Sequence, residues 1–355
     1  MLQIFFTPSA PDLTALQDDE NLRPAVTFIK HWYAGADSFT FTSSGSTGIP
    51  KSIVLSKDFL IASAKRTIEL FNISSSDRLL LALNTSFMGG MMMVVRALVA
   101  GCELVYLSPD QVHANNFKTL PPIKLASLVP AQVHGLLIDH STDPFTAIDN
   151  LLLGGAPVSK SLEQRIAALN SACHFYHTYG MTETASHVAI RMLNDNSPYQ
   201  ALEGFEFSQN EKECLVIHHL KNPAFTLTTN DVVHLYTPYT FDWIGRADWV
   251  INSGGIKYSL EQAEECIADF MHTYHLPNLF TSYKSTDDVW GDKWILLVTG
   301  SLSQDLVDQL KTHCKNTLGK YIYPKEILFT KKIVYLSSGK VDRFNSYQQA
   351  IKPSI

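Results

Sequence analysis

Residues 79–107 read LLLALNTSFMGGMMMVVRALVAGCELVYL and combine two short apolar runs with a helix-like segment between them. The apolar runs are Leu79–Leu83 and Glu103–Leu107, and the helix-like segment is Met91–Ala100. Continuous apolar runs of this length are typical of strands that are buried on both faces of a parallel sheet. The stretch therefore predicts a strand–helix–strand unit of an α/β fold.

Strand-like and helix-like segments keep alternating on both sides of this unit. Phe39–Thr42 reads as a strand, and Ser56–Phe71 has helical periodicity behind Ser56, which is a favourable N-cap residue. The alternation continues through Leu125–Val129, Ala131–Asp139, Leu151–Leu153 and Lys160–Asn170. This pattern predicts a largely parallel sheet covered by helices.

The pattern changes after about Thr184, where strand-like runs follow one another at Cys214–His219, Phe225–Thr228 and Val232–Tyr236. Beyond Gly245 we expect a hairpin around Ser253-Gly254-Gly255, and then a helix with a capping box of Ser259 and Gln262. A strand, a helix and a strand follow at Trp294–Thr299, Leu302–Thr317 and Glu326–Phe329. The chain is thus expected to form a large N-terminal α/β domain over residues 1–246, with a β-rich section, and a small C-terminal α+β domain over residues 247–355.

Composition narrows the class of protein. Apolar residues make up 45% of the chain and charged residues 17%, and the net charge of −6 predicts no general attraction to nucleic acid or to anionic membranes. The most apolar stretch, Met91–Gly101, is too short to span a membrane and carries Arg96. The N-terminus lacks the basic region of a signal peptide, and the five cysteines form no CxxC pair. A cytoplasmic location with reduced cysteines is expected.

Residues 42–52 read TSSGSTGIPKS and form a candidate phosphate loop. Glycines let backbone N–H groups approach an anion, hydroxyl groups add donors, and Lys51 supplies a positive charge. The spacing is not that of a Walker A loop, because no helix is expected directly after Lys51. A flexible surface turn rich in serine and glycine is the alternative interpretation. The candidate phosphate contacts are Thr42, Ser43, Ser44, Gly45, Ser46, Thr47, Gly48 and Lys51.

The loop resembles the phosphate-loop signature of the adenylate-forming superfamily, which includes acyl-CoA synthetases, luciferases and the adenylation domains of peptide synthetases. In that family the loop closes over the β- and γ-phosphates of ATP. The segment Gly154-Gly155-Ala156-Pro157 is similar to the turn that lines the adenine pocket in the family. Tyr176–Thr184, YHTYGMTET, resembles the family's YGxTE motif. The resemblance implies that Tyr179 and Gly180 lie at the adenine, that Thr182 binds the α-phosphate and that Glu183 holds Mg²⁺.

Four later segments resemble family motifs in the same order along the chain. Asp231 stands in a T-N-D segment like the family's T-G-D, and with Arg246 it is implied to bind the ribose. Asp248 matches the interdomain hinge, and Gly254 with Gly255 matches the hairpin that lines the thiol tunnel. Lys340, in SGKVDR, matches the lysine that contacts the substrate carboxylate and the α-phosphate.

The resemblance implies an enzyme that uses ATP and Mg²⁺ to activate a carboxylic acid and then transfers the acyl group to a thiol, coenzyme A or a carrier protein. The short region before Thr42 makes the chain similar to compact o-succinylbenzoate–CoA ligases of menaquinone biosynthesis. The candidate acid pocket contains Phe87, Ser186, His187 and Arg191. On a strand, Ser186 and Arg191 would face opposite sides, so both cannot line one pocket.

Other readings stay open at this point. The acid could be an aryl or fatty acid, or the acyl acceptor could be a carrier protein. A nucleotide-binding protein without catalysis is a further alternative. A shortened N-terminal region could expose an apolar patch that a second subunit covers, so a homodimer is also left open.

Overall fold

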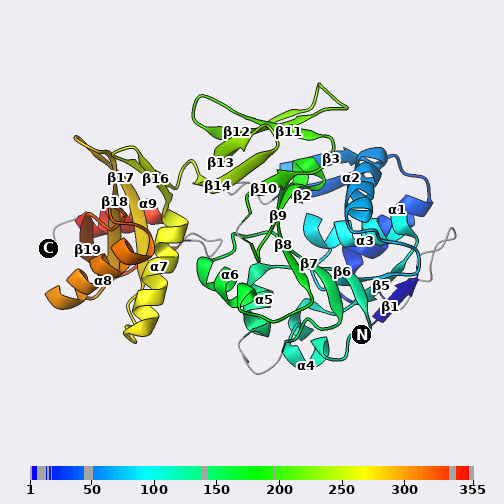
Figure 1. Cartoon of the computed structure of the whole chain (residues 1–355), viewed down its shortest axis with the longest axis horizontal. Coiled ribbons are helices and arrows are strands. Elements are labelled where there is room, and N and C mark those ends of the chain that lie inside the picture. The colour runs from blue at the N-terminus through cyan, green and yellow to red at the C-terminus, as the bar shows by residue number, and fades with distance from the viewer. Residues whose placement is uncertain are drawn as a thin grey trace. The chain divides into compact units, whose positions relative to one another are not determined.

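The computed structural model describes residues 2–5, 13, 16, 18–43, 51–137, 143–195, 197–335 and 341–351. The chain divides into two compact units, Met1–Phe205 and Glu206–Ile355, which are called unit 1 and unit 2 below (Figure 1). Each unit is described by itself.

Unit 1 is built around a mixed sheet whose strand order is β1-β5-β4-β6-β7-β8-β9-β10. The strands β5, β4, β6, β7 and β8 run parallel to one another, whereas β1, β9 and β10 pair antiparallel with their neighbours. This arrangement confirms the predicted α/β fold. The bounds of the strands are β1 Leu2–Phe5, β4 Arg78–Leu81, β5 Glu103–Tyr106, β6 Ile123–Leu128, β7 Ile148–Leu153, β8 His174–Met181, β9 Ser186–Met192 and β10 Tyr199–Ala201.

Helices cover both faces of this sheet. Leu80 and its equivalents on the neighbouring strands pack with α5 (Pro130–Leu136) and α6 (Lys160–Ala167) in one apolar cluster. The alternate residues Leu79 and Leu81 point to the other face, where α3 packs against β4, β5 and β6 (Figure 1). Because α3 (Met88–Ala100) leads from β4 to β5 whereas the later crossovers lead away from β4, the order of the parallel strands reverses between β4 and β6.

A separate hairpin carries the ends of the candidate phosphate loop. Strand β2 (Ser38–Ser43) pairs antiparallel with β3 (Lys51–Ser56), and the register places Ser43 opposite Lys51. A strand, and not a helix, therefore begins at Lys51. This agrees with the expectation that the loop is not a Walker A loop. Ser56 then caps α2 (Lys57–Leu70), because its hydroxyl accepts a hydrogen bond from the N–H of Phe59 at 3.2 Å. The other elements of unit 1 are α1 Arg23–Tyr33, α4 Ala114–Phe117, η2 Pro109–Gln111 and η3 Thr182–Thr184.

Unit 2 begins with neighbouring strands in the order β14-β13-β12-β11, of which β14, β13 and β12 pair antiparallel, and this is the predicted β-rich section. The sequence predicts two strands at Phe225–Thr228 and Val232–Tyr236, but the structure has one, β13 (Thr226–Thr237). The T-N-D segment between them continues the strand, and a register shift between Val232 and Val233 takes up the irregularity. The other strands are β11 Phe205–Gln209, β12 Cys214–His219 and β14 Thr240–Arg246.

The rest of unit 2, where the structure describes it, is a second sheet with the helices α7, α8 and α9. Strands β16-β15-β18-β17 are neighbours in that order, and β19 runs parallel to β18. Trp294, fully buried on β18, lies in the core between this sheet and the helices α7 and α8. The bounds are β15 Val250–Ser253, β16 Ile256–Ser259, α7 Leu260–Thr273, β17 Phe280–Asp287, β18 Gly291–Thr299, α8 Gln304–Thr317, β19 Glu326–Thr330 and α9 Arg343–Ile351.

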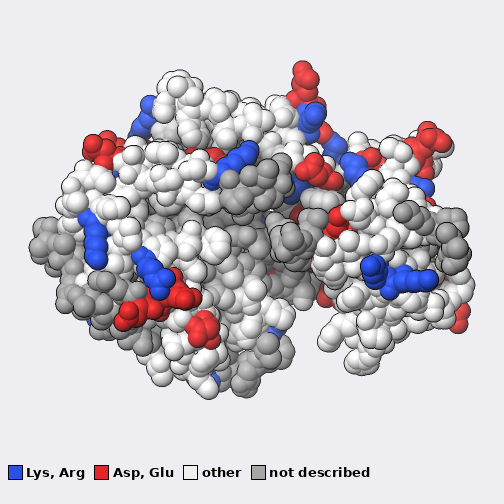
Figure 2. Space-filling model, turned by 180° about the vertical axis from the view of Figure 1, so that it is seen from behind, with Lys and Arg blue, Asp and Glu red and all other residues white. Residues whose placement is uncertain are grey.

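The surface carries charges of both signs in small groups. On the face seen in Figure 2, lysine and arginine side chains lie among aspartates and glutamates, with wide uncharged areas between them. Within the described ranges, no helix is both long enough and apolar enough to cross a membrane. The five cysteines are all buried and none forms a disulfide, as expected from their spacing.

Candidate active site

A cavity of about 440 Å³ lies in unit 1 at the carboxyl ends of the parallel strands. The residues that follow β4, β6 and β7 line it, which places it where the strand order reverses. Crevices at such a reversal are the usual ligand sites of open α/β sheets. The lining residues are Thr42, Leu83, Asn84, Phe87, Met88, Gly89, Gly90, Arg96, Ser127, Leu128, Val129, Leu152, Gly154, Gly155, Thr178, Gly180, Met181, Thr182, Ser186 and His187.

Many of the residues singled out from the sequence meet at this cavity. Those that line it are Thr42, Phe87, Gly154, Gly155, Gly180, Thr182, Ser186 and His187. Others lie elsewhere in unit 1 and are not part of the lining: Ser43, Lys51, Ala156, Tyr179, Glu183 and Arg191. The predicted contacts Ser44, Gly45, Ser46, Thr47 and Gly48, and the predicted catalytic Lys340, lie outside the described residues.

Gly154 and Gly180 are among the glycines that bring backbone close to the cavity where a side chain would not fit. A Cβ on Gly154 would lie 2.6 Å from Oγ1 of Thr178. A Cβ on Gly180 would lie 2.1 Å from the carbonyl oxygen of Ser186 and 2.5 Å from Cα of His187. The close approach of β8 and β9 at this point therefore requires glycine at position 180, which explains the glycine of the YGxTE-like segment.

A buried histidine supports the turn at Gly154–Ala156. Nε2 of His177 lies 3.2 Å from the carbonyl oxygen of Ala156, and Nδ1 lies 2.7 Å from the hydroxyl of Tyr199. A carbonyl oxygen can only accept, so Nε2 carries the proton and Nδ1 accepts from Tyr199. Burial, assisted by the charge of Arg191, lowers the pKa of His177 to about 3. The ring is therefore a neutral spacer between β10 and the turn.

Arg191 does not reach the cavity. It forms an ion pair with Glu163 of α6, and its guanidinium lies over the ring of Tyr199 at 5.4 Å from the centroid. Ser186, at the other end of β9, does line the cavity. The sequence argument that these two side chains cannot share one pocket agrees with this placement.

The cation at the cavity is Arg96, which was not among the candidate site residues. Arg96 lies on α3 and is 1% exposed. One Nη2 hydrogen bond goes to the hydroxyl of Ser186 at 2.8 Å, and Nδ1 of His187 lies 3.4 Å from the same nitrogen. Within the described part of the chain Arg96 has no carboxylate partner, and its Nε has no hydrogen-bond partner.

The charge of Arg96 survives its burial. Desolvation lowers the pKa of the guanidinium to about 9, so the group still carries a proton at neutral pH. A lone arginine in the otherwise uncharged helix Met88–Ala100 is the sequence signal that could have identified it. A buried charge is rare without a partner, so its position in an apolar helix already indicates a specific role.

The residues present fit ATP and Mg²⁺. The glycines that line the cavity carry no side chain, so a nucleotide could approach the backbone there. Thr182 also lines the cavity and offers a hydroxyl donor. Glu183 is half-buried on η3, next to Thr182. No group of three or more potential metal ligands occurs among the residues that the structure covers. Mg²⁺ is commonly held by one or two carboxylates together with phosphate oxygens, so Glu183 is suited to this role.

In unit 2 the predicted ribose ligands face each other. Asp231 and Arg246 are opposite one another on β13 and β14, with Nε of Arg246 3.9 Å from Oδ1 of Asp231. Asp248, the predicted hinge, is exposed and accepts a hydrogen bond from Asn230 at 2.9 Å. Asn230 thus has a structural use at the position where the family motif carries glycine.

The expected glycine hairpin is present in unit 2. Strands β15 and β16 pair antiparallel around Gly254 and Gly255, whose φ values of 60° and 83° lie in the left-handed region. Two consecutive residues of this kind form the hairpin turns that match the twist of the strands. The N–H of Gly254 also donates to the carbonyl oxygen of Trp290 at 2.9 Å.

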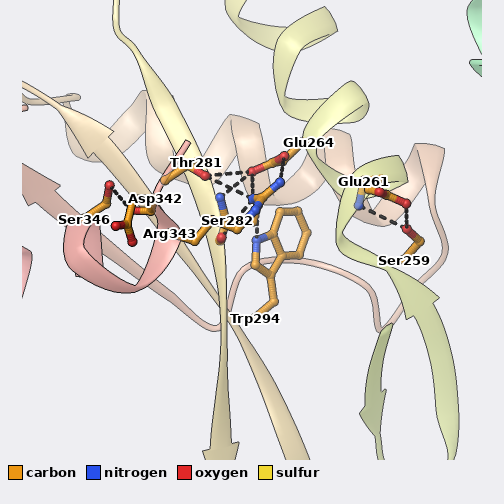
Figure 3. A network of polar contacts seen from close by, with 9 residues as sticks. All are labelled: Ser259, Glu261, Glu264, Thr281, Ser282, Trp294, Asp342, Arg343 and Ser346. Carbon is orange, nitrogen blue, oxygen red and sulfur yellow. Dashed lines mark hydrogen bonds and ion pairs between the residues drawn. The ribbon is translucent and has the colours of Figure 1, made fainter. Parts of the chain in front are cut away.

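The segment after Lys340 is fixed to the sheet of unit 2 by Arg343 (Figure 3). Nη2 of Arg343 donates to Oε2 of Glu264 at 2.6 Å, and Nη1 donates to Thr281 Oγ1 and to the carbonyl oxygen of Ser282, each at 3.0 Å. The guanidinium also lies over Trp249, 4.6 Å from the ring centroid. A bidentate arginine–carboxylate pair fixes direction as well as distance, so the start of α9 is held firmly.

Comparison with known proteins agrees with this geometry. Residues 34–205 match the family described as AMP-binding enzyme. A solved structure from Dyadobacter fermentans, an acyl-CoA synthetase (AMP-forming)/AMP-acid ligase II-like protein, is 32% identical and covers 94% of this chain and 95% of its own, with a TM-score of 0.58. The 2-succinylbenzoate–CoA ligase of Listeria monocytogenes is 23% identical over 345 residues, which are 89% of this chain and 70% of the ligase.

The fold is also similar to that of a structure solved with a reaction intermediate. The o-succinylbenzoate CoA synthetase of Bacillus subtilis, in complex with its acyl-adenylate, has a TM-score of 0.70 at 20% identity, over 89% of this chain and 70% of the synthetase. The chain belongs to the adenylate-forming superfamily of AMP-binding enzymes. Within that superfamily the relatives reported above are ligases of the AMP-forming acid–thiol class.

The buried His177 predicts a pH dependence of stability. An unfolded histidine titrates near pH 6.5, whereas the pKa of His177 in the folded protein is about 3. Between these values only the unfolded state binds the proton, so the free energy of unfolding should fall as the pH falls below about 6.5, by up to about 1.4 kcal/mol per pH unit from this group. Denaturant unfolding of wild type and His177→Gln between pH 7 and 5 measures it. Parallel curves for the two proteins would contradict the assignment.

Gly180→Ala tests the close approach of β8 and β9. The added methyl group has no space beside Ser186 and His187, so the strands must separate. We expect loss of ATP-dependent pyrophosphate release together with a lower free energy of unfolding, by roughly 1–3 kcal/mol. Gly135→Ala in α5 is the matched control, because nothing lies within 4 Å of its added Cβ. That control should keep full activity and gain up to about 1 kcal/mol of stability.

Proposed function

We propose that this ligase activates an aromatic dicarboxylic acid, o-succinylbenzoate, with ATP and transfers the acyl group to coenzyme A. The observation that carries the proposal is the buried charge of Arg96 at the cavity, which lacks a carboxylate partner among the described residues. An acid with two carboxylates has one to be activated and one to pair with this guanidinium. A monocarboxylic acid would leave the cation without a counter-charge.

The walls of the cavity suit the rest of such an acid. Leu83, Phe87, Met88, Val129 and Met181 offer apolar surface for an aromatic ring. The N-terminal turn of α3 also lines the cavity, and the positive end of a helix favours an anion. The Listeria and Bacillus relatives are named for 2-succinylbenzoate, which is an acid of this class.

The chemistry proceeds in two steps. The acid carboxylate attacks the α-phosphorus of ATP, the bond to the pyrophosphate breaks, and an acyl-adenylate forms. The thiolate of coenzyme A then attacks the acyl carbon, and AMP leaves. Negative charge accumulates at the α-phosphate in the first step, and we assign its stabilisation to Lys340 and Thr182. Mg²⁺ on Glu183 would neutralise charge on the phosphates.

The nucleotide contacts are assigned to residues that the family motifs indicate. The adenine would lie against Gly154, Gly155, Ala156 and Tyr179, and the ribose would be bound by Asp231 and Arg246. The loop of residues 42–48 with Lys51 would contact the β- and γ-phosphates. Each of these contacts can therefore be tested by mutating the residue assigned to it.

Substrate binding and the catalytic lysine would belong to two different domains. Residues 1–246 would bind ATP and the acid, and residues 247–355 would be a mobile domain that carries Lys340. Rotation about Asp248 would exchange Lys340 for the hairpin of Gly254 and Gly255, so that one domain serves both half-reactions. Arg343, three residues after Lys340 in the sequence, supports this role of the small domain, because its bond to Glu264 fixes the start of α9 to that domain.

Lys340→Ala should separate the two half-reactions. Removing the ammonium group is expected to lower pyrophosphate release with o-succinylbenzoate by about 10²–10³-fold, since one group that stabilises developing charge is lost. Thioester formation from supplied acyl-adenylate and coenzyme A should continue near the wild-type rate. Equal losses in both half-reactions would contradict the assignment, and pyrophosphate release at the wild-type rate would exclude it.

Arg96→Met tests the class of acid. The assay compares o-succinylbenzoate with two monoacid analogues, 4-oxo-4-phenylbutanoate and 2-butanoylbenzoate, each of which lacks one carboxylate. We expect wild type to prefer the diacid by about 30-fold to several thousand-fold in kcat/KM, which corresponds to about 2–5 kcal/mol for a buried charge pair. Arg96→Met should abolish most of that preference and leave the KM for ATP unchanged.

Arg23→Met is the matched control for the loss of one positive charge, because Arg23 is exposed at the start of α1. It should keep the wild-type preference. A wild-type protein that forms acyl-adenylate equally well from the diacid and from a monoacid would overturn the proposed substrate, while the class of ligase would stand.

A further inference from the structure

The backbone is kinked where η3 passes into β9. Ala185 has φ 54° and Ser186 has φ 125°, both in the region that favours glycine, although neither residue is glycine. The register of β8 with β9 also shifts here, since Gly180 pairs with His187 but Tyr179 pairs with Ala189. In a regular strand, Ser186 and His187 would point to opposite faces. The kink instead brings both side chains to the same guanidinium, that of Arg96.

Side chains around the kink hold it in place. The hydroxyl of Ser63, on α2, donates to the carbonyl oxygen of Ala185 at 2.9 Å. The hydroxyl of Thr184 donates to the carbonyl oxygen of Ser186 at 2.6 Å and accepts from the N–H of Met181 at 3.0 Å. Strained backbone of this kind costs of order 1–3 kcal/mol and persists where its surroundings determine it. Such strain concentrates at functional sites.

The tautomer of His187 follows from its neighbours. Nδ1 of His187 lies 3.2 Å from the hydroxyl of Ser186 and 3.4 Å from Nη2 of Arg96, and because a guanidinium can only donate, Nδ1 accepts. The proton therefore lies on Nε2, which is 3.4 Å from the hydroxyl of Thr67. Thr67 is fully buried, and its own hydroxyl lies 3.5 Å from the carbonyl oxygen of Ser63, one turn earlier on α2. Burial and the charge of Arg96 lower the pKa of His187, so the ring stays neutral.

Arg96 depends on these contacts for its orientation. Its Nε has no hydrogen-bond partner, and Nη1 lies 3.3 Å from the sulfur of Met93, which is a weak acceptor. Ser186 and His187 are therefore its two acceptors of ordinary strength among the described residues. Both contact the same nitrogen, Nη2, so the orientation of the guanidinium depends on the side chains at positions 186 and 187.

We propose that His187, held by Thr67, is a positioning residue that fixes the guanidinium of Arg96 in the cavity and so sets the preference for an acid with a second carboxylate. The inference rests on the proposed function and deepens it. His187 does not contact the reacting atoms. It acts through Arg96, and the kink at Ala185–Ser186 is the feature of the backbone that makes this contact available.

The experiment measures kcat and KM for o-succinylbenzoate and for its two monoacid analogues in wild type, His187→Leu, His187→Asn and Thr67→Val. His187→Leu should raise the KM of the diacid roughly 10-fold with little change in kcat, as expected for one lost hydrogen bond to a charged group. The KM of ATP and the KM of the monoacid that keeps the reactive carboxylate should stay within about 2-fold, because that monoacid has no second carboxylate to pair with Arg96. His187→Asn, whose side-chain oxygen replaces Nδ1 as acceptor, should restore most of the preference.

Thr67→Val removes the acceptor for Nε2, together with the long contact to the carbonyl oxygen of Ser63, and provides a variant of unchanged volume if His187→Leu folds poorly. It should give a smaller loss of diacid preference in the same direction. Thr312→Val is the matched control, since Thr312 donates to the carbonyl oxygen of Asp308 on α8 in the same way that Thr67 approaches Ser63. This control should leave every kinetic constant unchanged.

The outcomes separate the inference from the function on which it rests. If wild type and Arg96→Met differ in diacid preference but His187→Leu and Thr67→Val keep it, His187 is not a positioning residue. Equal rises in KM for the diacid and the monoacids would also overturn the inference, because they indicate general disruption. If wild type shows no diacid preference, the proposed substrate falls, and the inference falls with it.

Discussion

A positive charge that has been taken out of water is the constraint around which the cavity of unit 1 is built. Burying an ion costs several kcal/mol even after relaxation of its surroundings, and the lowered pKa of Arg96 expresses that cost. The protein offsets part of it with neutral acceptors from Ser186 and His187. Because these acceptors are neutral, the positive potential of Arg96 stays available to a ligand. A glutamate in the same place would have cancelled that potential.

This constraint explains several local features together. The helix that carries Arg96 is apolar elsewhere and packs on the sheet, so the guanidinium is held away from solvent. The acceptors must come from a neighbouring element, and the segment between η3 and β9 adopts strained φ values in supplying them. Gly180 is required because that segment lies against β8. The glycine, the strain and the buried cation therefore belong to one arrangement.

Much of this could be predicted from the sequence, because the signals are local. The apolar runs of residues 79–107 predict a buried parallel sheet, and the predicted caps Ser56 and Ser259 cap the helices that follow them, although Ser259 bonds to Glu261 and does not form the predicted capping box with Gln262. The YGxTE-like segment and the Gly154–Gly155 turn meet at one cavity, as the order of motifs indicates. The single strand β13 was missed, since the polar residues of its T-N-D segment read as a turn.

The acid end of the site was harder to predict, because it depends on contacts between segments far apart in the chain. Arg191 is polar and close to the motif, yet Glu163 of α6 pairs with it. Arg96 lies in a segment whose apolar character predicts only core packing. Its hydrogen-bond partner Ser186 stands 90 residues later in the sequence. No periodicity in either segment reveals that pairing. The predicted contacts in residues 44–48 and at Lys340 remain predictions.

The edge of the sheet in unit 1 has a consequence for the order of folding. Strand β1 pairs with β5, Leu2 opposite Tyr106, so the chain must complete the β4–α3–β5 unit before β1 has this partner. Closing so long a loop carries an entropic cost that only a preformed sheet edge can repay. During synthesis, residues 2–5 therefore emerge before β5 and dock late. Once docked, they cover β5, whose free edge would otherwise be open to pairing with another chain.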